Sequence, residues 1–226
     1  MVAAKLSSKD KSLDENNIFA VDRHLSLLKS AAIYGANASG KSNLVKAIRF
    51  MQWFILNSSK ETQATEMIHL ERFKLSAETE GKPSSFEIVF LMDEKVHRYG
   101  FEITEKEVVS EWLFYTPTTK EMKIFERKGK NISVARIFKG SRGVIARTRE
   151  NALFLSVAAQ FNVEIADKVL AWFSENLKID IDIDKIWGRQ FTIKSLEHPK
   201  YRNKILQLLK GTSKNQSETK NENKKR

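Results

Sequence analysis

The stretch from Tyr34 to Asn43, "YGANASGKSN", decides the fold, because it matches the pattern Gly-x-x-x-x-Gly-Lys-Ser in full. A glycine at position 35 permits a sharp turn, and one at position 40 lets backbone N–H groups close around phosphates. Lys41 is placed to reach the β- and γ-phosphates as the catalytic lysine, and the Ser42 hydroxyl to hold a bridging Mg²⁺. The predicted nucleotide-binding residues are Gly35, Ala36, Asn37, Ala38, Ser39, Gly40, Lys41, Ser42 and Asn43.

The segments on either side of this loop fit a phosphate-binding motif. Residues 25–35, "LSLLKSAAIYG", form an apolar run that ends in glycine, which predicts a buried strand leading into a tight loop. Beyond the loop, apolar side chains recur at spacings of three and four and predict one face of a helix of about four turns; they are Leu44, Ile48, Met51 and Ile55. Strand, glycine-bearing loop and helix is the order that the motif requires.

The middle of the chain has the pattern of a β-meander. Residues 86–104, "FEIVFLMDEKVHRYGFEIT", alternate apolar side chains around a short polar break, which predicts a hairpin turning near Asp93 to Lys95. The segments 110–117, 122–129 and 131–138 also read as strands, and 150–177 as helical. We therefore predict an α/β fold in which a mixed sheet carries an antiparallel β-subdomain and a helical segment, unlike the regular alternation of a doubly wound sheet.

Composition and charge narrow the function classes. The chain has no cysteine, so disulfides and thiol nucleophiles are excluded. With no apolar run of about 20 residues and no signal-peptide pattern, we expect a cytoplasmic protein without a membrane partner. Residues 120–150 carry 10 basic and 3 acidic side chains, and residues 211–226 carry 5 and 2. Such localised basic charge favours nucleic acid or another polyanion as a partner.

The loop also resembles a known family. The stretch 35–48, "GANASGKSNLVKAI", is similar to the P-loops of the RecF and SMC branch of ABC-type ATPases. It is still more similar to prokaryotic ATP-binding proteins of the AAA-15 type, OLD-like relatives found in anti-phage and abortive-infection systems. Ala38, where RecF and SMC proteins usually have glycine, is typical of that type. The resemblance continues through "PSSFEIVF", "HRYGFEIT" and "NALFLSVAAQFN", over residues 1–190.

The resemblance implies a P-loop NTPase domain of ABC/SMC-like type over residues 1–210. Its parts would be a P-loop lobe over about 24–57, a β-rich segment over about 68–140 and a helical segment over about 150–177, with a disordered basic tail over 211–226. It also implies ATP hydrolysis with ATP and Mg²⁺ as cofactors. In such ATPases the nucleotide is held between the P-loop of one subunit and the signature segment of another, so self-association or a second chain is expected.

Several elements of that family are not found in this sequence. No Leu-Ser-x-Gly signature follows residue 100. We therefore expect the chain to represent the amino-terminal part of a larger ATPase, cut short or completed by another chain, and to hydrolyse ATP weakly or not at all when isolated. One Asp-Glu pair ends an apolar run, at Asp93 and Glu94. These two residues are either the catalytic carboxylates that support Mg²⁺ and activate water, or simply a hairpin turn.

Three further groups have two readings each. Gln160 could sense the γ-phosphate or lie on a helix surface. Four basic residues could contact nucleic-acid phosphates or form a solvated loop: Lys139, Arg142, Arg147 and Arg149. Three alternating aspartates could bind a cation or protect a strand edge: Asp180, Asp182 and Asp184.

Two functional hypotheses follow, with a small-molecule kinase as a weaker third. The first is an AAA-15 type ATP-binding protein whose hydrolysis resets an effector in anti-phage defence or in a DNA-associated process. The second is a non-catalytic module that binds ATP structurally and uses its basic segment for nucleic acid or a partner protein.

Overall fold

The computed structural model describes residues 17–21, 26–37, 39–60, 63, 66–71 and 81–179, together with positions 197 and 202. The chain divides into two compact units, Met1–Leu177 and Lys178–Arg226. Three predicted features lie outside the described residues: Ala38 of the loop, the group of aspartates at 180, 182 and 184, and the tail over 211–226. The domain boundary at residue 210 stays a prediction.

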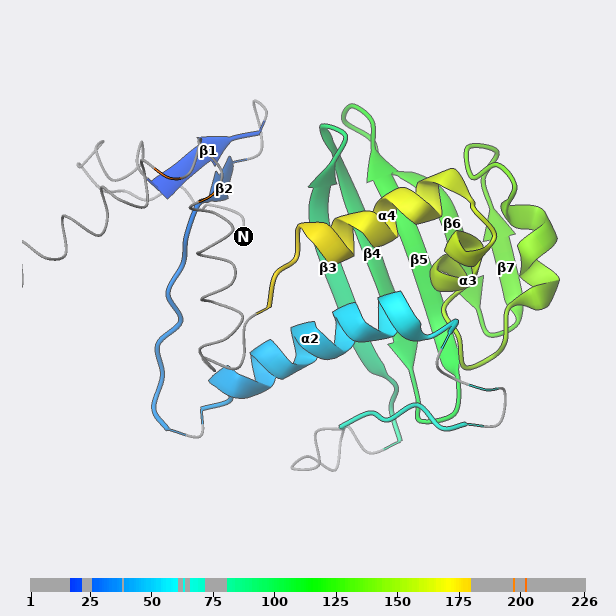
Figure 1. Cartoon of the computed structure of the whole chain (residues 1–226), viewed down its shortest axis with the longest axis horizontal. Coiled ribbons are helices and arrows are strands. Elements are labelled where there is room, and N and C mark those ends of the chain that lie inside the picture. Colours follow the sequence, from blue (N-terminus) through cyan, green and yellow to red (C-terminus); the bar gives the residue numbers. More distant parts are fainter. Residues whose placement is uncertain are drawn as a thin grey trace, which may run out of the picture. The chain divides into compact units, whose positions relative to one another are not determined.

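Five consecutive antiparallel strands form the main sheet, in the order β3-β4-β5-β6-β7 (Figure 1). Their bounds are Ser84–Met92, Lys95–Ile103, Val108–Thr116, Met122–Lys128 and Asn131–Val134. The alternation of apolar and polar side chains produces this meander, because each strand buries one face and leaves the other toward water. The predicted β-subdomain is therefore confirmed. A separate antiparallel pair joins β1 (Ile18–Ala20) to β2 (Ser26–Leu28).

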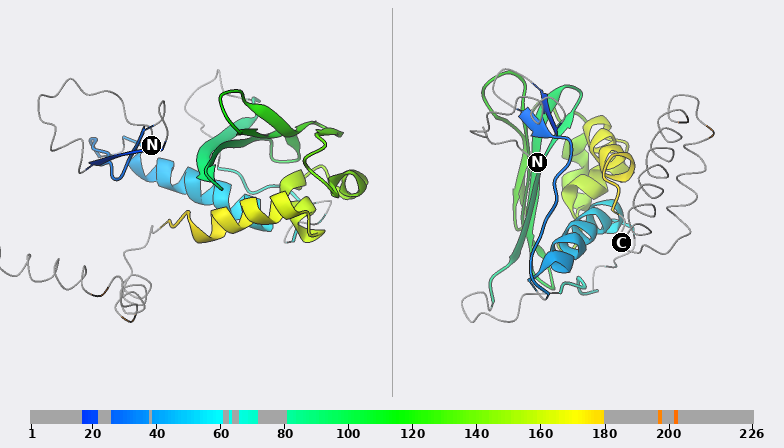
Figure 2. Two further views of the ribbon diagram at one scale, coloured as in Figure 1. Left: turned by 90° about the horizontal axis from the view of Figure 1, so that it is seen from above. Right: turned by 90° about the vertical axis from the view of Figure 1, so that its left-hand side faces the viewer.

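The helices cover one face of the main sheet, as two views show (Figures 1 and 2). They are α2 (Lys41–Asn57), α3 (Phe154–Gln160) and α4 (Glu164–Glu175), and a 3₁₀ helix, η2 (Ser141–Arg147), follows β7. The predicted helix after the P-loop is confirmed, and Met51, Phe54 and Ile55 are its buried residues. The predicted helical region at 150–177 is two helices, because Asn162 between them has a left-handed φ of 57°.

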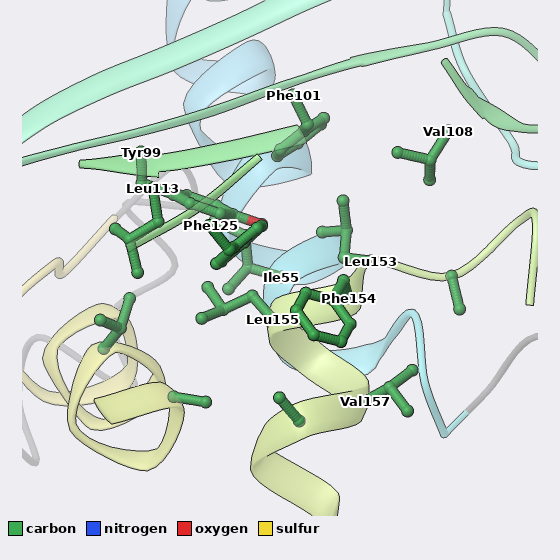
Figure 3. Packing of buried hydrophobic residues seen from close by; sticks show 14 of the residues in the cluster. Ile55, Tyr99, Phe101, Val108, Leu113, Phe125, Leu153, Phe154, Leu155 and Val157 are labelled. Atoms are coloured by element: carbon green, nitrogen blue, oxygen red, sulfur yellow. The ribbon is translucent and has the colours of Figure 1, made fainter. Parts of the chain in front are cut away.

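The core lies between the sheet and these helices, and aromatic side chains pack there among aliphatic ones (Figure 3). Phe54 of α2 packs against Phe101 of β4 with its ring tilted by 55° and ring centroids 5.6 Å apart. Phe125 of β6 meets Phe154 of α3 edge to face at 5.1 Å. Such pairs add about 0.5–1.5 kcal/mol each beyond the area that they bury. These ring contacts therefore join α2 and α3 to the sheet.

A buried polar cluster ties α3 to the sheet. Glu111 of β5 is fully buried and accepts the backbone N–H groups of Phe154 and Leu155 at 2.7 and 3.0 Å. Tyr99 donates its hydroxyl to the same carboxylate at 3.0 Å, and the guanidinium of Arg127 lies 3.9 Å from it. The sheet thus supplies the cap that α3 lacks in its own sequence, since Leu153 cannot cap a helix with its side chain.

Burial shifts the pKa values of Glu111 and Arg127 in this cluster. Burial raises the pKa of Glu111 above its ordinary value of 4.5, against the opposing effect of Arg127. Burial also lowers the pKa of Arg127, whose guanidinium donates to four backbone carbonyls. These belong to Gly129, Arg149, Glu150 and Ala152. Arg127 therefore braces the segment between η2 and α3.

On the outer face of the sheet, the indole of Trp112 lies across the neighbouring strand at Gly100. Gly100 of β4 pairs with Trp112 of β5. A Cβ at position 100 would lie 2.5 Å from Trp112 Cζ2 and 2.7 Å from the Phe86 carbonyl oxygen. The indole N–H donates to Glu87 at 2.8 Å, and Arg98 binds the same carboxylate at 2.9 Å. Glycine is therefore required where the indole crosses the strand.

The strand predicted before the P-loop is the main correction to the sequence-based fold. Only Ser26–Leu28 is a strand, and residues 29–37 are exposed and belong to no sheet. Ile33 is 58% exposed and Tyr34 is 91% exposed. All described strand pairs are antiparallel, so the predicted mixed sheet is wrong for this part of the chain. The physical reason is that residues 29–36 have no partner strand among the described residues.

Candidate functional site

The loop between residues 35 and 41 is closed by its own lysine. Lys41 donates its ammonium group to the carbonyl oxygens of Gly35 and Ala36 at 2.6 and 2.7 Å. Its Nζ lies 3.4 Å from the Ser39 hydroxyl. The backbone adds a turn in which the Ser39 N–H donates to the Ala36 carbonyl at 3.2 Å. The positive charge is therefore held at the mouth of the loop, where an anion can replace these carbonyl contacts.

Both motif glycines are required by the geometry. A Cβ at Gly35 would collide with the Ser39 hydroxyl, so the loop can turn this tightly only without a side chain there. Gly40 has a φ of 90°, a left-handed conformation that L-residues rarely adopt. It stands at the N-cap of α2, and the Leu44 N–H donates to its carbonyl at 3.1 Å. The two glycines predicted to shape the loop therefore do so.

The amino end of α2 is left open for an anion. The helix has no side-chain cap and no acidic residue in its first turn. Within the described part of the chain, the backbone N–H groups of Lys41, Ser42 and Asn43 donate to no acceptor. Free amides at the end of a 17-residue helix carry a partial positive charge and favour phosphate. The exposed Ser42 and Asn43 side chains border the same end.

These groups fit the triphosphate of a nucleotide with Mg²⁺. A polyphosphate requires hydrogen-bond donors and space. The ammonium group of Lys41 and the free backbone amides are the donors, and the missing side chain of Gly35 leaves the space. The Ser42 hydroxyl is the ligand that this motif offers to Mg²⁺. When bound, Mg²⁺ neutralises charge on the phosphates. The residues of the loop and of the first turn of α2 would hold and orient the phosphates, and Lys41 would stabilise added negative charge.

Asp93 and Glu94 lie at the tip of a hairpin. They form the two-residue turn between β3 and β4, whose register pairs Met92 with Lys95. Their φ angles of 50° and 59° are those of a type I′ hairpin turn. Asp93 contacts Lys168 of α4 at 3.8 Å. The hairpin reading is confirmed, because the apolar strand reverses direction at these two residues, and a catalytic role for Asp93 and Glu94 stays a prediction.

The remaining predicted site residues differ in their exposure and in their contacts. Gln160 is exposed at the last residue of α3, as expected for a surface glutamine. Arg149 is partly buried and donates to the Ser59 carbonyl at 3.2 Å, so its role is structural. The other three, Lys139, Arg142 and Arg147, are exposed on and beside η2. The predicted solvated loop thus contains a 3₁₀ helix, and three of the four basic side chains are exposed on it or beside it.

One further basic residue belongs to this surface, although the sequence pattern did not indicate it. Arg136 is exposed and lines the same hollow as Lys139 and Arg142. It stands in "NISVARIF", which was assigned to a strand as a whole, although β7 ends at Val134. Alternation alone would have placed Arg136 on the face of Ile132 and Val134. Its exposure follows instead from the end of β7 at Val134, which the sequence pattern did not predict.

Two absences hold for the part of the chain that the structure describes. No three histidine or carboxylate side chains gather there as they would around a metal ion. None of the described helices has the length and apolar character that a membrane span demands.

The P-loop, its lysine and the open helix end define the class: this is a P-loop ATPase-like domain with an α/β fold. Residues 30–215 match the model of a family described as "AAA domain, putative AbiEii toxin, Type IV TA system". The chain belongs to that AAA-domain family, whose function is ATP-binding and ATPase-like in general. No curated protein and no solved structure matches the chain.

Proposed function

We propose that this protein is an ATP-binding ATPase subunit of the ABC-like AAA-15 type that acts in anti-phage defence or in a DNA-associated process. The observation that carries the proposal is the closed loop of Lys41 in front of the uncapped amino end of α2. The toxin–antitoxin wording of the family's description supports a role in defence. ATP and Mg²⁺ are the proposed ligands, and Gly35–Asn43 the proposed binding segment, with Ser42 at the metal.

The site is proposed to be completed by a second polypeptide segment, from another copy of this chain or from a different protein. No acidic side chain contacts the P-loop within the described residues, so the carboxylate that activates water must come from elsewhere. Residues 30–36, which lead into the loop, also form no strand pair among the described residues, and Ile33 and Tyr34 are exposed. Added strands would bury these side chains and satisfy their backbone groups.

Calorimetric titration with ATP and Mg²⁺ tests the binding part of this proposal. The expected result is saturable binding by the native chain and by Lys46→Ala, and loss of binding in Lys41→Ala. Lys46 is a matched control, because it stands on the same helix and contacts Glu71 at 3.8 Å instead of the loop. Native protein that is folded but takes up no ATP would overturn the proposal.

Phosphate release tests the completion of the site. The isolated chain is expected to release phosphate slowly or not at all, since the described residues offer no carboxylate to the loop. Robust turnover by the purified chain would contradict the need for a second segment. The alternative is a module that uses ATP only as a structural ligand. It would be favoured if the chain binds ATP tightly but does not hydrolyse it with any of the candidate partners tested.

A further inference from the structure

We propose that η2 and its flanks form a binding surface for the sugar-phosphate backbone of single-stranded nucleic acid. The surface consists of five exposed basic side chains and one exposed aromatic ring: Lys106, Arg136, Lys139, Arg142, Arg147 and Phe161. It does not use the P-loop, so it is an activity separate from the proposed ATPase function.

Two hollows lie along η2 and both are lined by basic groups. The first, of about 450 Å³, is bordered by Arg136, Lys139 and Arg142. The second, of about 680 Å³, is bordered by Lys106 and Arg147. Because residues of η2 line both hollows, a linear anion passing along this helix meets basic side chains in succession. This arrangement suits a chain of phosphates better than a single compact anion.

The five basic side chains of this surface have no ion-pair partner in the part of the chain that the structure describes. By contrast, Lys130 at the rim of the second hollow is paired with Glu150 at 2.6 Å. Unpaired, exposed guanidinium and ammonium groups remain free to displace counterions from phosphates, which is the main source of affinity in such complexes.

An exposed ring distinguishes nucleic acid from an acidic peptide as the partner. Phe161 is 43% exposed, and the guanidinium of Arg147 lies 4.8 Å from its ring centroid. A ring with a cation held over it provides a flat platform for a base beside a contact for its phosphate. Bases are accessible for stacking in single strands, so the surface is expected to favour these over duplexes.

Fluorescence anisotropy with labelled 20-mers of DNA and RNA, single-stranded and duplex, tests the proposal on the full chain across a salt series. The test variant is Arg136→Gln/Lys139→Gln/Arg142→Gln. Its matched control is Lys82→Gln/Lys95→Gln/Lys120→Gln, which removes the same charge from exposed positions near the ends of strands β3–β6. Three lost contacts are expected to reduce the slope of log affinity against log salt by about 2, since each contributes roughly 0.7 for single strands.

The remaining outcomes separate the alternatives. Phe161→Ala is expected to weaken single-strand binding about five- to a hundredfold and duplex binding much less. Equal weakening by the test and control variants, or equal competition by polyglutamate, would overturn the proposal in favour of unspecific attraction of anions. Preference for RNA or DNA identifies the strand. Lys41→Ala is expected to leave the affinity unchanged, so failure of ATP binding and failure of this surface are distinguishable.

Discussion

Replacing Arg127 by methionine should remove the brace between the sheet and the segment before α3. Arg127 is only 2% exposed. If its guanidinium is removed, neither water nor another donor can take over its hydrogen bonds unless the surrounding structure rearranges. The variant leaves the fully buried carboxylate of Glu111 without the positive group 3.9 Å away. It also removes the donor of the Ala152 carbonyl, a 2.6 Å hydrogen bond. Methionine has a similar volume, so the change tests charge and hydrogen bonding more than packing.

The expected loss is about 3–5 kcal/mol, which for an m-value near 2 kcal/mol/M lowers the urea midpoint by roughly 1.5–2.5 M. Unfolding is followed by tryptophan fluorescence in urea. The loss should be larger at pH 7.5 than at pH 5, because without Arg127 the pKa of Glu111 rises further. A raised pKa in the folded state gives stability that is full below 4.5 and declines as pH increases through the folded value.

The control is Lys130→Met, which breaks the exposed ion pair with Glu150 beside the same segment. It should leave the urea midpoint unchanged, since exposed pairs contribute little. A midpoint for Arg127→Met that falls no further than that of Lys130→Met would refute the view that Arg127 braces this segment.

Three further predictions concern the sheet. Gly100→Ala should destabilise the fold by about 1–3 kcal/mol in urea, because the new Cβ would lie 2.5 Å from Trp112, whereas Gly143→Ala has open space and should change little. Glu94→Gly should stabilise by up to about 1 kcal/mol, since it relieves a left-handed φ of 59°, and a loss of stability would contradict that turn geometry. Burial lowers the pKa of His97, so the free energy of unfolding should fall as pH drops from 6.5 toward the pKa of the folded state. The variant His97→Phe should flatten this pH dependence. A pH profile that the variant leaves unchanged would exclude His97 as its source.

Local patterns predicted most of the main sheet and the course of α2. Alternation around Asp93 and Glu94 identified the hairpin, because period-2 patterning and a two-residue polar break are both local signals. The motif Gly35–Ser42 likewise predicted its own loop, since the pattern encodes the turn, the close approach and the helix start in contiguous residues. The break at Asn162 was missed because two amphipathic helices in succession give nearly the same pattern as one.

Features that depend on distant partners could not be predicted with the same success. The apolar character of residues 29–36 indicated that they can be buried, but no local pattern names a partner strand. The pairing of Glu111 with Arg127 was missed for a similar reason. A signal existed, because Glu111 is in phase with the buried Leu113 and Arg127 with the buried Phe125. When two strands each carry a charged residue at a position that alternation assigns to the buried face, the two residues should therefore be examined as a buried ion pair.

The two proposed sites are connected by α2. Its amino end carries Lys41, and its 17 residues extend about 25 Å at 1.5 Å each. Its carboxyl end is fixed to α3, where the Leu153 N–H donates to the Ser58 hydroxyl at 3.2 Å and Ser156 donates to the Ser59 hydroxyl at 2.8 Å.

Ser59 also provides the carbonyl that binds Arg149, two residues after η2. A rigid displacement of α2 by bound nucleotide would therefore act directly on the segment that carries the basic surface. Linkage makes any such effect reciprocal: if ATP changes the affinity for nucleic acid, then nucleic acid must change the affinity for ATP by the same factor. The hydrogen bonds of Ser58 and Ser59 would determine the size of that factor, because they join α2 directly to α3 without involving the sheet.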